Sequence, residues 1–149
     1  MTTIDRDAAR QLYKVRGCLE TLVVAEFTEN ASEDQRQNLF SIADRLDTLA
    51  ENDGVEVLVS VKNELYTCIL EGSGNAVLIQ LFVQINNRIG HLRRLSLSNP
   101  GRLPETQKEI RATVEAIRNR LPDIARQLAQ RHVERAGAVV ISSLDEKEA

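Results

Sequence analysis

Hydrophobic side chains recur at three- and four-residue steps along nearly the whole chain, which is the spacing of the buried face of an α-helix. One stripe runs from Leu12 to Phe27 and another from Leu78 to Leu95. No stretch alternates between apolar and polar residues as a half-buried β-strand does. The pattern therefore predicts an all-α fold, an antiparallel bundle of six or seven helices.

Turn-forming residues separate the predicted helices. Ser32 and Gln35 fit a capping box, and Asn75 is placed to cap the helix after the Gly72-Ser73-Gly74 turn. Pro104 suits the first position of a helix, and Gly137 suits the end of one. We expect helices over residues 5–30, 33–51, 55–71, 76–97, 104–120 and 123–136, a short helix or docked segment over 138–144, and a charged tail over 145–149.

The apolar stripes also predict which side chains face inward. The domain is expected to span residues 1–144, and its inward positions include Val15, Leu22, Leu81 and Ile124. On the last helix, His132 follows Ile124 and Leu128 at four-residue spacing, so the same face is expected to carry it inward.

Composition limits the classes of protein that the chain could form. Hydrophobic residues make up 42% of it but aromatic residues only 3%, which predicts an aliphatic core. The net charge of −3 argues against non-specific binding to DNA or to acidic membranes. No apolar run approaches the ~20 residues of a membrane span. Cys18 and Cys68 fall in apolar helical patterns, so we expect buried free thiols and a reduced, cytoplasmic compartment.

No catalytic motif is present. The sequence has no phosphate-binding loop, no His-Glu-x-x-His and no paired Cys-x-x-Cys. It also lacks the Glu-x-x-His pair of di-iron bundles. The chain is therefore not expected to be an enzyme.

Polar side chains on or beside buried helical faces are the remaining candidates for function. Arg16 either pairs with Glu20 one turn later or points into a polar cavity. Lys62 and Tyr66 lie one turn apart, at the rim of an apolar face. The candidate ligand-binding residues are Arg16, Lys62, Tyr66, Arg88, His91 and His132.

The two histidines allow different interpretations. His132 is either a core histidine bonded to a backbone carbonyl or a residue of a binding pocket. His91 and Arg88 share a helical face, which is either solvated or directed at an anion in a cavity.

Four segments follow one another along the chain: Tyr13-Lys-Val-Arg16 with Leu19-Glu20, the stretch 62–75, residues 91–103 and residues 109–132. In this order they resemble the C-terminal effector-binding (FCD) domain of FadR-subfamily GntR transcription regulators. The first segment is similar to the family's opening motif, and the second to its Asp-x-x-Phe-His segment with the following Asn. The third resembles the link before the next helix, and the fourth has the length of the family's late Glu-His to His motif. The resemblance covers about residues 12–136.

The resemblance implies a helical bundle around a central cavity that binds a small effector, commonly a carboxylic acid, and a homodimer that spaces two winged-helix DNA-binding domains. No winged-helix segment precedes the first helix, so DNA is expected as a partner only through a domain absent from this chain. Many family members also hold a divalent metal in the cavity by one Asp and three His.

Departures from the family motif concern the metal ligands. Lys62 stands at the position of the Asp, Tyr66 at that of one His, and Ile110 at that of another. Only His132 matches its ligand position, while His91 lies close to the remaining one. Because an ammonium group opposes a divalent cation and isoleucine offers no lone pair, we expect the metal site to be lost and no cofactor to be held.

The resulting hypothesis is a ligand-binding and dimerisation domain of a bacterial regulator, in which Lys62 supplies the positive charge for a carboxylate effector directly. The alternative is a helical interaction or scaffold module without a small-molecule pocket, with Lys62 pointing to water.

Overall fold

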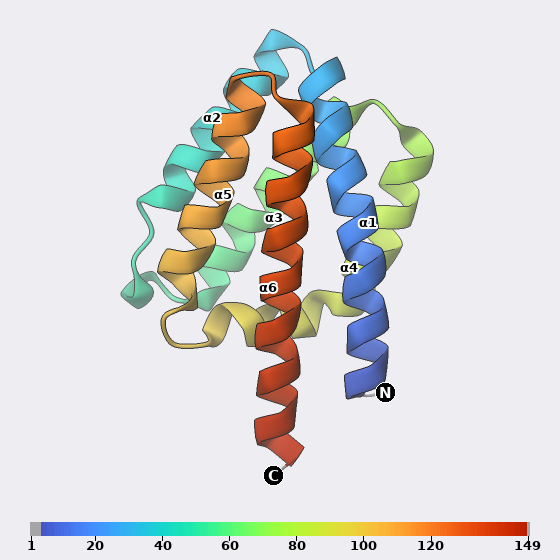
Figure 1. The fold of residues 1–149 in the computed structure, drawn as a ribbon. Helices are drawn as coiled ribbons and strands as arrows, with labels where there is room; N and C mark the ends of the chain where they lie inside the picture. Colours follow the sequence, from blue (N-terminus) through green and yellow to red (C-terminus); the bar gives the residue numbers. More distant parts are fainter. Residues whose placement is uncertain (1–3, 149) are drawn as a thin grey trace.

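Six α-helices and one short 3₁₀ helix make up the computed structural model, which describes residues 4–148, the side chains of 147 and 148 excepted. The elements are α1 (Arg6–Asn30), α2 (Glu33–Asp47), η1 (Glu51–Asp53), α3 (Val55–Ser73), α4 (Ala76–Ser98), α5 (Arg102–Arg118) and α6 (Pro122–Glu148). Figure 1 shows them as a bundle in which α6 lies beside α1 on one side and α5 on the other. The predicted all-α bundle is confirmed.

Side-chain caps define the helix starts as the sequence predicts. Ser32 Oγ accepts from Gln35 N at 3.1 Å, and the Gln35 side chain accepts from Ser32 N at 2.9 Å, which completes the capping box. Asn75 Oδ1 accepts from Leu78 N at 3.0 Å. These bonds satisfy amide groups that have no partner within the first helical turn.

Several helix boundaries differ from the prediction. Helix α2 ends at Asp47 rather than near residue 51, and the separate 3₁₀ helix η1 follows it. Helix α5 begins at Arg102, two residues before Pro104, because Gly101 adopts a left-handed conformation (φ 81°) that ends the preceding loop. Helix α6 does not stop at Gly137 but continues to Glu148, through the predicted tail. A Cβ on Gly137 would lie 3.3 Å from the Tyr13 side chain, so this glycine permits the close approach of α1 rather than ending a helix.

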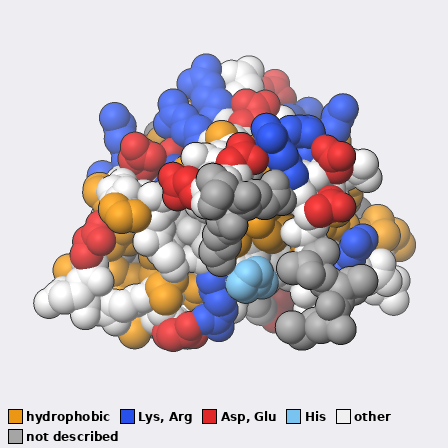
Figure 2. Space-filling view, turned by 90° about the horizontal axis from the view of Figure 1, so that it is seen from below, with side chains coloured by type: hydrophobic (Ala, Val, Ile, Leu, Met, Phe, Trp, Pro, Cys, Tyr) orange, Lys and Arg blue, Asp and Glu red, His pale blue; other side chains and the backbone are white. Residues whose placement is uncertain are grey.

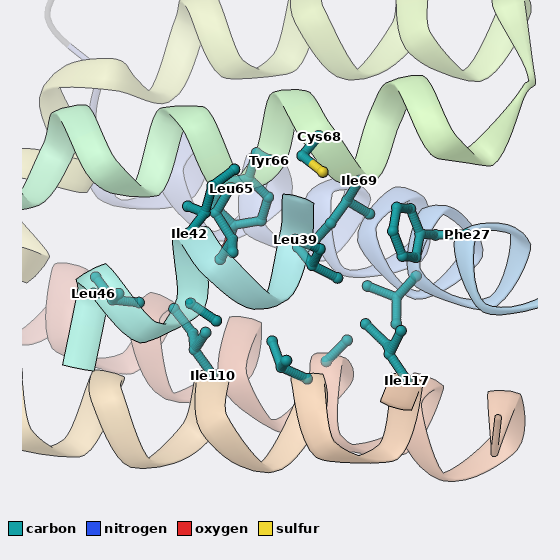
Figure 3. Packing of buried hydrophobic residues seen from close by; sticks show 14 of the residues in the cluster. Phe27, Leu39, Ile42, Leu46, Leu65, Tyr66, Cys68, Ile69, Ile110 and Ile117 are labelled. Carbon is teal, nitrogen blue, oxygen red and sulfur yellow. The ribbon is translucent and has the colours of Figure 1, made fainter. Parts of the chain in front are cut away.

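The main hydrophobic core is formed where α1, α2, α3 and α5 converge. Figure 3 shows Phe27, Leu39, Ile69 and Ile117 directed toward one another from these four helices. Aliphatic residues dominate the cluster, in line with the low aromatic content. Burial of this apolar surface is the main source of stability for such a bundle.

A second, smaller core joins α1, α4 and α6 toward the end of the bundle where both described chain ends lie (Figure 1). It contains Leu12, Ile89, Leu92, Val133 and Val140, all at most 5% exposed. Between the two cores lies a group of buried polar side chains.

Several side chains that were expected to be buried are exposed. The exposed fractions are 46% for Val15, 41% for Leu22, 46% for Leu81 and 47% for Ile124, and Cys18 is also exposed. The stripes of these helices are wider than the faces that neighbouring helices cover, so residues at the edge of each stripe reach the surface. Cys68 is buried as predicted.

Charges of both signs are interspersed on the face seen in Figure 2, without a large basic region there. Among the described residues, no helix has the length and apolar character needed to cross a membrane.

Replacing Gly72 should destabilise the fold. In α3, a Cβ at this position would overlap the Phe27 ring of the main core, so we expect Gly72→Ala to lower the free energy of unfolding by about 1–3 kcal/mol, measured by urea denaturation. Gly90 in α4 is the matched control, because a Cβ there meets no atom within 4 Å. Gly90→Ala should be neutral or stabilise the helix, and equal losses in the two variants would contradict this account.

Candidate functional site

Eight buried polar residues from five helices lie between the two hydrophobic cores, and we call them the inner polar cluster. They share exposed fractions of at most 9%, although all are charged or strongly polar. The inner polar cluster consists of Arg16, Glu20, Lys62, Tyr66, Arg93, Arg102, Glu109 and His132. Polar side chains are rarely buried to this extent unless they are paired or serve a function.

Arg16 anchors the α1 side of the cluster. Its Nε lies 3.3 Å from Glu20 Oε2, which confirms the pairing of these residues one turn apart, and its Nη2 donates to Tyr66 Oη at 3.1 Å. The guanidinium also lies over the rings of Tyr13 and Tyr66, with centroid distances of 5.2 and 5.8 Å. Burial acts to raise the pKa of Glu20, but Arg16 and the other nearby cations outweigh it, so that its pKa is lowered.

Glu109 is the hub on the α5 side. Both of its oxygens accept from Arg102, at 2.9 and 3.0 Å, and His132 Nδ1 lies 2.7 Å from Oε1. Arg135 adds a longer contact of 3.4 Å. Although burial acts to raise the pKa of Glu109, the hydrogen bonds from His132 and Arg102 outweigh it and lower the pKa to about 2. Glu109 is therefore ionised and bound on three sides.

Lys62 and His132 meet at the centre of the cluster. Lys62 Nζ lies 3.4 Å from His132 Nε2. Burial, and then the nearby Lys62, lower the pKa of His132 to about 4, so the ring is neutral, donates through Nδ1 to Glu109 and accepts at Nε2. Burial, together with Arg16 and Arg93, lowers the pKa of Lys62 well below its ordinary value.

Arg93 is the member of the cluster that α4 contributes, and it lies against Tyr66. Its guanidinium carbon lies 5.1 Å from the ring centroid. It donates through Nη2 to Asn86 Oδ1 at 2.7 Å and through Nη1 to Asn63 Oδ1 at 3.3 Å. Among the described residues, no carboxylate lies within 4 Å of it as an ion pair. Burial, and then Arg16, lower the pKa of Arg93.

Basic groups outnumber acidic ones in the inner polar cluster. Four basic side chains, Arg16, Lys62, Arg93 and Arg102, face only two carboxylates, Glu20 and Glu109. A cavity of about 30 Å³, which we call the central cavity, borders the cluster. It is lined by Glu20, Tyr66 and His132 and otherwise mainly by apolar side chains. That volume is of the order of one water molecule.

Four of the six predicted site residues come together in this cluster: Arg16, Lys62, Tyr66 and His132. Arg88 and His91 lie exposed on α4 and do not join it. His132 is a buried histidine, but its partners are a carboxylate and a lysine rather than a backbone carbonyl. The alternative in which Lys62 points to water is wrong, because its side chain is only 2% exposed.

The positions of the family's metal ligands do not form a metal site here. Lys62, Tyr66 and Ile110 supply an amine, a phenol and an alkyl chain where the motif has carboxylate and imidazole groups. Within residues 4–146, no three His, Cys, Asp or Glu side chains are grouped as metal binding requires. These residues do not fit a divalent cation.

Four members of the cluster were missed as site residues: Arg93, Arg102, Glu109 and Glu20, the last named only as a partner of Arg16. A signal existed for Arg93, because it follows Ile89 by four residues and therefore shares its buried face. Glu109 likewise lies three residues after the fully buried Thr106. A charged residue at a buried helical position is the pattern that identifies both.

The buried His132 makes stability depend on pH. Its folded-state pKa of about 4 lies below the ordinary 6.5, so its contribution is complete above pH 6.5 and is lost as the pH falls toward 4. Between pH 7 and pH 5 we expect this residue to lower the free energy of unfolding by about 2 kcal/mol. Urea denaturation should show a pH dependence that is smaller by this amount in His132→Gln.

His91→Gln is the matched control, because His91 is exposed and its replacement should leave the pH dependence of wild type intact. The lowered pKa of Glu109 changes the free energy of unfolding only below about pH 4.5. This effect lies outside the range from pH 7 to pH 5 used here. An identical pH dependence in wild type and His132→Gln would show that His132 titrates normally in the folded protein.

A solved structure of a single domain resembles this chain over nearly its whole length. The structure matches the metal-free FCD domain of TM0439, a protein described as a candidate transcriptional regulator, with a TM-score of 0.80, 20% sequence identity and coverage of 97% of this chain and 99% of that one. At this identity the match shows a common fold. No curated protein matches the sequence.

The sequence itself matches the model of the FCD domain over residues 11–135. This agrees with the extent of about 12–136 that the four motif segments indicate, and it spans most of the chain. The chain therefore belongs to the FCD domain family.

Proposed function

We propose that this chain is the effector-binding and dimerisation domain of a cytoplasmic GntR-family transcription regulator of the FadR subfamily in a bacterium, that it senses a small carboxylate, and that it has no enzymatic activity. The observation that carries this proposal is the excess of basic groups in the inner polar cluster. The description of the structurally similar TM0439 domain supports a regulatory role.

The charged form of a buried basic group is costly without a counter-ion, because it has lost its hydration. The lowered pKa of Lys62 reflects this cost. Arg16 is paired with Glu20, and Arg102 with Glu109. Lys62 and Arg93 have no carboxylate partner of their own among the described residues. A carboxylate ligand would supply the missing charge through short, charge-assisted hydrogen bonds.

Binding would act by a shift between conformations. The central cavity of about 30 Å³ is too small for an organic acid, and Lys62 does not line it and is only 2% exposed. A carboxylate must therefore move side chains of the cluster apart to reach Lys62. Since the cluster joins α1, α3, α4, α5 and α6, such a change can alter the arrangement of a dimer. The proposed DNA partner would be contacted by a winged-helix domain outside this chain.

A helical interaction module without a ligand is the second candidate. The small volume of the central cavity favours it, as do the exposed apolar residues of α1 and α4. The two functions differ in their response to small acids, which only the first requires.

Carboxylates should stabilise the protein through Lys62. In a thermal-shift assay with acetate, succinate and citrate, we expect at least one acid to raise Tm of wild type, because binding at about 100 times Kd adds about 2.7 kcal/mol. Lys62→Met should bind about tenfold more weakly or worse, since it removes a charge-assisted hydrogen bond.

Lys108→Met is the matched control, because it removes an exposed lysine of α5 and should respond like wild type. Equal responses of Lys62→Met and wild type would exclude a role for Lys62. The metal content of protein purified without chelator belongs to the same experiment: stoichiometric zinc, nickel or manganese that is lost in His132→Gln would contradict the proposal of a metal-free site.

The proposed homodimer is supported by an exposed apolar surface on α1 and α4. Asn75 donates to Glu26 at 3.3 Å, which places the start of α4 beside the end of α1. Arg93, near the end of α4, and Arg16 both contact the Tyr66 ring, so the two helices run antiparallel. Their exposed apolar residues include Val15, Leu22, Val77 and Leu81, and apolar side chains of this kind suit burial between two copies.

Charge on this surface should disrupt the dimer. Light scattering after size exclusion should give twice the 16.7 kDa chain mass for wild type and the single mass for a Leu22→Lys, Leu81→Lys double variant, because a buried, unpaired ammonium opposes association. Val57→Lys replaces an exposed valine of α3 and should remain dimeric. A monomeric wild type would rule out the proposed dimer.

A further inference from the structure

A cleft of about 340 Å³ opens between α3 and α4 on the outer side of Tyr66. Asn63, Thr67, Asn86 and Asn87 supply amide and hydroxyl groups to its walls, and Arg93 contributes to it from α4. Tyr66 lines both this cleft and the central cavity of about 30 Å³. The side chain of Tyr66 is therefore common to the two hollows, the larger outer cleft and the smaller inner cavity.

We propose that this cleft, and not the inner cavity, is where a small carboxylate ligand first binds, with Arg93 as its anion-binding residue. The inference rests on the proposed effector role and names the site of that role. A volume of about 340 Å³ falls in the range of small-molecule pockets, whereas the inner cavity is an order of magnitude smaller.

The hydrogen-bond partners of Arg93 are neutral, so its positive charge remains available to an anion. Its side chain is 5% exposed, and its two bonded nitrogens are held by the amide oxygens of Asn63 and Asn86. Its Nε is buried and has no hydrogen-bond partner among the described residues. Amide oxygens fix the orientation of the guanidinium but leave its charge intact, so that the planar fork can bind a carboxylate.

The surrounding charges favour an anion in this place. Arg16 and Lys62 lie on the same tyrosine ring as Arg93, at 5.8 and 5.6 Å from its centroid. Glu20 is the nearby acidic group of the cluster, and it is paired with Arg16. Arg94 also lines the cleft and pairs with Glu56. The cleft is therefore bordered by two basic residues, of which Arg93 has no acidic partner.

The connection through Tyr66 explains how ligand in the cleft can affect the rest of the domain. Arg16 donates to Tyr66 Oη at 3.1 Å, so a movement of the ring away from a ligand on Arg93 would alter the contact between α1 and α3. Arg93 is thus a binding residue, while Tyr66 is a positioning residue that joins the cleft to the inner polar cluster.

Asn86→Asp is the decisive variant. An aspartate can accept the same bond from Arg93 Nη2, now 2.7 Å long, and it neutralises the guanidinium in place with little change in shape. We expect it to raise Tm and to weaken carboxylate binding about tenfold or more. Because the variant should be more stable than wild type, loss of binding cannot be attributed to unfolding. Arg93→Gln should lose binding as well.

The measurement is a ¹H–¹⁵N NMR titration with succinate at constant ionic strength. In wild type, saturable shifts are expected at the amides of Asn63, Thr67, Asn86 and Asn87 and at Arg93 Nε. Arg88→Gln is the matched control, because it changes the net charge by the same amount as Asn86→Asp on an exposed part of the same helix, and it should retain these shifts.

Three results would overturn the inference: no saturable shifts in the cleft of wild type, shifts confined to residues of the inner cavity such as Glu20 and Ile110, or equal affinity in Asn86→Asp and wild type. If the NMR shifts are confined to the inner cavity and vanish in Lys62→Met, the proposed effector function stands. Only the proposal that the cleft is the binding site is then rejected. Cleft binding that Lys62→Met does not change would reject the role of Lys62 and retain the cleft.

Discussion

Glu109 is a buried carboxylate that accepts hydrogen bonds at both of its oxygens, and the positions of His132 and Lys62 depend on it. Its carboxylate binds Arg102 within α5 and His132 across to α6, and through His132 it fixes the position of Lys62 on α3. A carboxylate buried in an aliphatic bundle must be saturated with donors to be tolerated. Because Glu109 needs these donors, α3, α5 and α6 must lie in one specific arrangement. Contacts between aliphatic side chains alone are less specific.

The same network lies at and beside the positions where the family motif implies metal ligands. A divalent cation would draw carboxylate and imidazole groups together from several helices. Here, a lysine, a neutral imidazole and a carboxylate form a continuous line, Lys62–His132–Glu109, across the same helices. The fold thus keeps a cross-link between α3, α5 and α6, but the cross-link consists only of side chains. Such a link can be opened by an anion, which a tightly held metal would resist.

Periodicity and capping chemistry were sufficient to predict the six helices, and the i to i+4 rule predicted the Arg16–Glu20 pair. The end of α6 could not be predicted, since a glycine that ends a helix and one that lets another helix approach are the same in sequence. Gly137 is of the second kind because Tyr13 lies against it. Lys62, Tyr66 and His132 were predicted as site residues because they stand at positions of the family motif. Arg93 was missed because its role depends on Asn63 and Asn86, which only the packing of α3 on α4 brings to it.

The placement of the tyrosines has a practical consequence. The chain has no tryptophan and two tyrosines, Tyr13 and Tyr66, and the Arg16 guanidinium lies against both rings. Near-ultraviolet emission of the unmodified protein therefore originates almost entirely from residues in contact with one buried arginine. The domain carries its own optical reporter, and a change in tyrosine emission under native conditions reads out changes around Arg16 without any attached dye.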